Sequence, residues 1–178
     1  MTSKSKSMKR QGIPVLLAVV VATGLLLSLP GCYTFSGFSL DPTLQTYKVA
    51  QFENTAENAL PSLAQSMADA LREKIRTESR LTYNDDTPDI EFRGTLVDYR
   101  ITAEAPRTGE SAAINRLTIT LAIEYFNHRD NKQVWKRNFS FFFDFPSDRD
   151  FASVESQALR TITTQLMEDI FNAAFSDW

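Results

Sequence analysis

Two neighbouring stretches of strict alternation constrain the fold of this chain most strongly. In residues 115–126, every second side chain is a large apolar one, which is the period of a strand with one buried face. The same period returns in residues 135–145, where one face is aromatic except for Arg137. These two faces consist of Leu117, Ile119, Leu121, Ile123, Tyr125, Trp135, Phe139, Phe141, Phe143 and Phe145. The polar segment 127–132 between them predicts a tight turn, so we expect a hairpin.

An amphipathic helix is predicted before this hairpin. From about Leu60 to Ile75, apolar residues recur at the spacing of one helix face, and the opposite face is polar. Asn54 and Glu57 have the spacing of a capping box, and Pro61 suits a first helical turn. We therefore expect this helix to begin close to residue 60.

The remaining segments complete an α+β order. Residues 46–52 alternate as a short strand, and residues 90–102 as a longer one whose apolar parity changes around 94–96, where we expect a bulge. A second apolar stripe predicts a helix over 151–175, with Ser147 and Asp150 able to cap it. The order is β-α-β-β-β-α. Because each element has one face to bury, we predict an α+β fold with a single mixed, antiparallel-rich four-stranded sheet and two helices on one face.

Phe142 breaks the pattern of the last strand. It lies on the face opposite to Phe141 and Phe143, and so points away from the predicted helices. Either a loop shields this ring at the sheet edge, or the second sheet face binds a partner, as exposed apolar surface often does. The sequence leaves both interpretations open.

The first 31 residues have the parts of a secretory signal peptide. A basic start is followed by the apolar run 13–29 and by Pro30 and Gly31, directly before Cys32. An uncleaved signal anchor is the alternative. Prolines and glycines interrupt the run, however, and no basic stop-transfer cluster follows Cys32. We expect residues 1–31 to be removed from the 178-residue chain, leaving 147 residues: a tether over 32–45 and a single domain over 46–178.

Charge and cysteine content limit the functions that the domain can have. The chain has 19 basic and 22 acidic residues; without the four basic residues of the leader, 15 against 22 give a net charge of −7. Such a domain is a poor candidate for nonspecific binding to nucleic acid or to an anionic membrane surface. Cys32 is the only cysteine, so the domain has no internal disulfide. This thiol is a buried core group, a nucleophile, half of an intermolecular disulfide or a lipid attachment site.

The sequence contains no recognisable catalytic constellation. The only histidine, His128, lies far from Cys32 and in a predicted turn. Asp85, Asp86 and Asp89 lack the spacing of a calcium loop and fit a solvated turn. We therefore expect no enzyme activity, no metal and no cofactor.

Basic side chains gather near the tip of the predicted hairpin. These are Arg129, Lys132 and Lys136, with Arg137 beside them. They either keep an exposed turn soluble or bind an anionic group such as a phosphate or carboxylate. On chemistry alone, Arg129, Lys132 and Lys136 are our candidate contacts for such an anion.

The segment Leu29-Pro30-Gly31-Cys32 resembles the bacterial lipobox. This resemblance implies that Cys32 carries diacylglycerol, becomes the mature N-terminus and anchors the protein, with several acyl chains giving stable attachment. The next residue is Tyr33 and not Asp. By resemblance to the usual sorting pattern, this implies the outer membrane.

The mature chain as a whole resembles the LptE family of lipopolysaccharide (LPS)-assembly lipoproteins in its Bacteroidota-type form. The resemblance rests on the lipobox with Cys32-Tyr33-x-Phe35-x-Gly37, on Asn115–Tyr125, on Glu168–Trp178 and on the element order. It implies a lipid-anchored protein at the periplasmic side of the outer membrane that binds the LptD β-barrel, plugs its lumen, helps it assemble and contacts LPS. The alternative is a free periplasm-facing lipoprotein that binds a small or lipidic ligand in an apolar cavity between helices and sheet.

Overall fold

The alternating stretches form the long hairpin of the sheet. In the computed structural model, which describes residues 41–105 and 113–176, three long strands follow one another in antiparallel pairing. They are β4 (Ile90–Glu104), β5 (Ile114–Asn127) and β6 (Lys132–Pro146). Across the β5–β6 hairpin, Leu117 pairs with Phe143 and Tyr125 with Trp135. The predicted hairpin is confirmed, and its apolar face is the one predicted.

The rest of the sheet is parallel to β4 and contains more strands than predicted. β1 (Thr46–Val49), β2 (Glu53–Asn54) and β3 (Thr82–Tyr83) give the order β3-β1-β4-β5-β6, with β2 pairing separately with β4. β1 pairs in parallel with both β3 and β4. This confirms the α+β class, the mixed sheet and the order of the larger elements. The predicted number of four strands was wrong. Strands of two residues have no periodicity from which a sequence could predict them.

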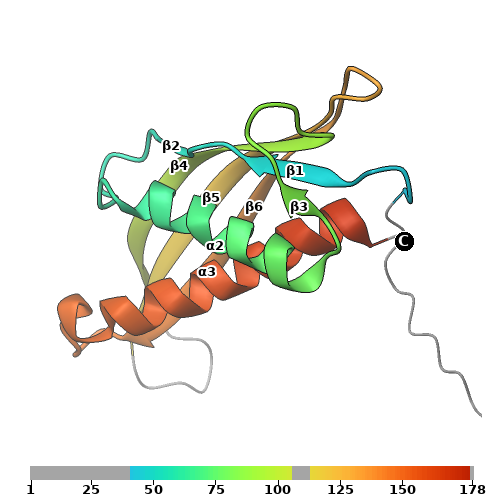
Figure 1. The fold of residues 1–178 in the computed structure, drawn as a ribbon. Helices are drawn as coiled ribbons and strands as arrows, with labels where there is room; N and C mark the ends of the chain where they lie inside the picture. Colours follow the sequence, from blue (N-terminus) through green and yellow to red (C-terminus); the bar gives the residue numbers. More distant parts are fainter. Residues whose placement is uncertain (1–40, 106–112, 177–178) are drawn as a thin grey trace, which may run out of the picture. The chain divides into compact units, whose positions relative to one another are not determined.

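Both helices lie on the same side of the sheet (Figure 1). They are α2 (Leu63–Glu78) and α3 (Phe151–Phe175). At the start of α3, the Asp150 side chain accepts a hydrogen bond from the Ala152 N–H, as predicted.

The predicted start of α2 was wrong. Asn54 belongs to β2, and its side-chain oxygen accepts the N–H of Ala56 at 3.0 Å instead of capping the helix. Ser62 precedes the helix without a side-chain cap, and Leu60 lies outside the core with 49% of its surface exposed.

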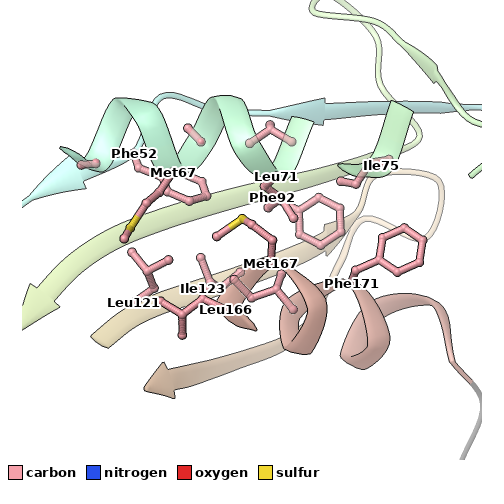
Figure 2. Packing of buried hydrophobic residues seen from close by; sticks show 14 of the residues in the cluster. Phe52, Met67, Leu71, Ile75, Phe92, Leu121, Ile123, Leu166, Met167 and Phe171 are labelled. Atoms are coloured by element: carbon pink, nitrogen blue, oxygen red, sulfur yellow. The ribbon is translucent and has the colours of Figure 1, made fainter. Parts of the chain in front are cut away.

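The core fills the space between the helices and the sheet. Figure 2 shows Met67 and Leu71 of α2 and Leu166 of α3 pointing toward Leu121 and Ile123 of β5, and all five side chains are fully buried. A contiguous apolar layer of this kind supplies most of the folding free energy.

One close approach and one bulge shape β4. A Cβ atom on Gly94 would lie 2.7 Å from the Phe52 ring, so only glycine lets this ring pack against the strand. The register of β4 against β5 shifts between Leu96 and Asp98. The bulge that the sequence predicted around residues 94–96 is therefore present, immediately after that segment. It leaves Val97 partly exposed.

Candidate functional site

The hairpin tip is fixed to the rest of the fold by Asp89. One carboxylate oxygen accepts the backbone N–H groups of Gln45 and Thr46 at 2.7 and 2.9 Å, and the other accepts Arg129 Nε at 2.7 Å. The Arg129 guanidinium, followed by these N–H groups, holds the pKa of Asp89 well below its usual range. Arg129, a candidate anion contact, is therefore engaged in joining the hairpin tip to β1 and to the turn before β4.

A charged hollow of about 470 Å³ lies beside this junction. On its wall Glu91, only 7% exposed, lies 2.8 Å from Arg93 Nη2 and 2.9 Å from His128 Nε2. Burial by itself would raise the pKa of Glu91, but the hydrogen bonds from Arg93 and His128 outweigh it and lower the pKa. Lys48 completes the charged lining through an ion pair with Asp85 at 2.8 Å.

Glu91 and its partners were not predicted from the sequence. From the sequence, His128 is an isolated residue of a turn, and it meets Glu91 only because the hairpin tip lies beside the start of β4. The aspartates of the preceding turn have structural roles: Asp85 pairs with Lys48, and Asp89 holds the hairpin tip.

The three candidate anion contacts line three different hollows. Lys136 Nζ pairs with Glu124 at 2.6 Å and borders a hollow of about 300 Å³ with Arg93 and Glu53. Lys132 borders another, of about 330 Å³, with Val134 and Tyr125, and makes no ion pair with any residue in the described ranges. Arg129 borders the hollow of Glu91. The fold therefore brings these cations to one end of the sheet but does not gather them into one pocket.

A second cluster occupies the helix-free face near the other end of β5. Arg116 donates to both carboxylate oxygens of Asp144 at 2.7 and 2.8 Å, and its guanidinium lies 3.9 Å above the Phe142 ring. This ring is 46% exposed. The exposure favours an open sheet face over a ring shielded by a loop. Arg116 and Asp144 are cross-strand partners, so a correct hairpin register would have predicted this pair from the sequence.

The helix-free face between these clusters is polar. Cross-strand pairs there include the Thr120 and Ser140 hydroxyls, 3.0 Å apart, and the Lys136–Glu124 ion pair. Within the described part of the chain, no helix covers this face (Figure 1). It offers hydrogen-bonding groups and paired charges to a polar partner surface.

A groove of about 620 Å³ runs between the two helices. Leu63, Leu159 and Met167 contribute apolar surface. Lys74 of α2 bridges the helices through an ion pair with Glu168 of α3, and it also pairs with Glu78 of its own helix. This groove borders the core at Leu63 and Met167, and it is the most apolar of these hollows.

The residues that the structure describes contain neither a group placed to bind a metal ion nor a helix able to span a membrane. No three histidine, cysteine or acidic side chains there are placed to hold a metal ion. None of the helices described is both long enough and apolar enough to cross a membrane.

Comparison with known proteins gives one sequence match and several structural ones. The family model described as LptE: Lipopolysaccharide-assembly matches residues 44–174. No curated protein matches the chain. The hypothetical protein CT253 from Chlamydia trachomatis superposes with a TM-score of 0.54 at 7% identity, over 74% of this chain and 95% of its own, which shows a shared fold. XCC0632 from Xanthomonas campestris has a TM-score of 0.49 at 15% identity, over 74% and 88% of the two chains.

Proposed function

We propose that this chain, which belongs to the LptE family of lipopolysaccharide assembly, is a non-enzymatic lipoprotein of the outer membrane. It binds and plugs an LptD-type β-barrel, supports the assembly of that barrel and assists the delivery of LPS to the cell surface. The observation that carries this proposal is the family match over residues 44–174, which extends from before β1 into the last turn of α3.

The proposed anchor is the lipid on Cys32, after removal of residues 1–31. Cys32, Tyr33 and Phe35 lie outside the described residues. The described end of the tether is attached to the hairpin end of the sheet, where Leu44 is buried and Asp89 binds the Gln45 N–H. Asp41 lies nine positions after Cys32, and a fully extended chain of that length spans at most about 32 Å. The hairpin end would therefore stay within that distance of the periplasmic membrane surface.

The proposed contact with LPS uses the cations of this end. Lys132 is the best placed of the three candidates, because it makes no ion pair in the described part of the chain. Arg129 is already paired with Asp89, and Lys136 with Glu124. An incoming phosphate would have to displace these carboxylates or share the cations with them. Phosphate contacts by Lys and Arg are favourable when geometry permits charge-assisted hydrogen bonds.

The alternative function is binding of a small or lipidic ligand by a free lipoprotein. The interior site that this function was expected to need is filled by side chains such as Met67, Phe92 and Leu121. The groove between α2 and α3 is the place where such a ligand would bind instead. It is large enough for part of an acyl chain, which keeps this function as the second candidate.

Co-purification tests the proposal. The full-length protein with an affinity tag is isolated from mildly solubilised outer membranes, beside a Cys32→Ala variant that cannot be lipidated at this position. We expect a large outer-membrane β-barrel to be recovered in about equal amount with the unmodified protein, and much less with the variant. Recovery of the unmodified protein without any barrel would overturn the proposal.

A further inference from the structure

β6 is a long strand with one unpaired edge. Among the described strands it pairs only with β5 and ends the order of the sheet. Along the fifteen residues Lys132–Pro146, about every second residue turns its backbone groups away from β5, where an additional strand can pair with them. Natural proteins cover or disrupt edges of this length, because they pair readily with other chains.

Apolar side chains lie on both faces of this edge. Phe139, Phe141 and Phe143 share the helix-covered side, yet they are only partly buried, because none of the described strands lies beyond them. Phe142, on the opposite face, is 46% exposed. One added strand would cover the exposed sides of both groups.

The charges of β6 indicate which strand fits. Lys132, Lys136 and Arg137 occupy its first half, and Asp144 is the only acidic residue, in the second half. A parallel copy of β6 would set like charges beside one another, whereas an antiparallel copy sets the basic half against Asp144. Opposite charges directly across an antiparallel pair are stabilising, and like charges are destabilising.

We propose that β6 pairs antiparallel with β6 of a second copy of this chain, about a two-fold axis at Ser140. In this register Lys136 faces Asp144 of the second copy on the helix-free side. On the helix-covered side, Phe139 faces Phe141 of the second copy. The interface is isologous, so every such contact occurs twice.

The side chains that make the charge pairs are already held in position. Glu124 holds Lys136, and Arg116 holds Asp144 through two hydrogen bonds. Pairing of two copies joins these ion pairs into a row of alternating charge that runs Glu124, Lys136, then Asp144 and Arg116 of the second copy. Little side-chain freedom is lost on association, because both partners are ordered in advance. On the other face, Arg137 meets the Phe143 ring of the second copy, a cation–π pair.

This self-association is independent of the proposed role in LPS assembly. It concerns the protein before or apart from its barrel partner, and it gives the aromatic edge a covering that the described part of one chain does not provide.

Disulfide trapping at the two-fold axis tests the register. Ser140→Cys places two thiols directly opposite each other, at a Cα separation of about 4.5–5.5 Å that suits a disulfide. Thr120→Cys is the matched control: it lies on the same face one strand further in, so its two copies would be about 14 Å apart. Both variants are made in the full-length protein, in detergent and without a barrel partner.

We expect mild oxidation to convert most of the Ser140→Cys protein to a covalent dimer and little of the Thr120→Cys protein. Equal and low dimer yields from the two variants would overturn the proposal.

Charge exchange gives a second test that does not depend on cysteine. Lys136→Asp sets Asp against Asp144, and Asp144→Lys sets Lys against Lys136, so each variant alone should dimerise about tenfold more weakly than the unmodified protein. Mixing the two variants restores both opposite-charge pairs. Sedimentation velocity should therefore show a heterodimer with nearly the original affinity. A mixture that associates no better than either variant alone would contradict the proposed register, and an unmodified protein that is monomeric at all accessible concentrations would refute the interface.

Discussion

The two faces of the sheet differ in how completely the chain itself covers them. On one face, β5 presents Leu117, Ile119 and Leu121 to two helices, and all three are fully buried. On the other face, the same strand presents Arg116, Thr118 and Thr120, whose neighbours are cross-strand polar groups. Alternating residues of one strand thus serve two purposes. The covered face holds the fold together, and the open face and its outer edge are available for partners.

Substitution of Leu121 should give the largest effect and test this comparison directly. Leu121→Ala removes a fully buried side chain from the layer between β5 and the helices, so we expect a loss of about 2–5 kcal/mol of unfolding free energy. The neighbouring Thr120→Ala removes only a hydrogen bond to Ser140 and should cost about 0.5–1.5 kcal/mol. Denaturant unfolding of both variants measures the difference. Equal losses would mean that the two faces contribute alike.

The junction at the hairpin end should depend on the charge of Asp89. Asp89→Asn weakens three charge-assisted hydrogen bonds, including that of Arg129, and should lower stability by about 2 kcal/mol at pH 7. Because the pKa of Asp89 is lower in the folded than in the unfolded protein, its contribution is complete above the unfolded value of about 3.9 and is lost as the pH falls toward the folded value. Unfolding at pH 7 and pH 3 should therefore show a smaller difference between the two proteins at pH 3. A constant difference would contradict this assignment.

The close packing at Gly94 gives an effect of similar or smaller size. Gly94→Ala places a Cβ atom 2.7 Å from the Phe52 ring and should destabilise the protein by about 1–3 kcal/mol. The double variant with Phe52→Leu relieves the clash, so its stability should exceed the value expected from adding the two single losses. Thermal unfolding of the four proteins completes this cycle. Simple additivity would show that Phe52 moves away without cost.

Surface charge on the open face should matter least for stability. Lys136→Ala breaks an exposed ion pair with Glu124 and should change the unfolding free energy by less than about 1 kcal/mol. If the open face binds partners, the same change should act on association more than on folding. A loss of stability comparable with that of Leu121→Ala would remove the distinction between the two faces.

Long periodic segments were predictable from the sequence, and short non-local contacts were not. Each alternating stretch has enough residues for the buried and exposed faces to be distinguished, and the same holds for the stripe of α3. β2 and β3 form only because β4 and β1 lie beside them. The spacing of Asn54 and Glu57 indicated a helix cap, yet Asn54 pairs with Leu96 in the sheet. Tertiary pairing overrides a local signal in that segment.

The candidate site shows the same division. The sequence identified a group of cations near the hairpin tip, and the topology does bring them to one end of the sheet. Their partners depend on contacts between distant segments: Asp89 and Arg129 are 40 positions apart, and Glu91 and His128 are 37 apart. Such pairs depend on the exact register of β4 against β5, which a bulge shifts, and periodicity alone does not supply it.

The most direct measurement of the proposed function is the amount of LPS at the cell surface after depletion of this protein. We predict that surface LPS falls as the protein is lost, together with the amount of correctly assembled barrel, and that both recover when the unmodified gene is restored. Surface LPS and barrel levels that remain unchanged after complete depletion would contradict it.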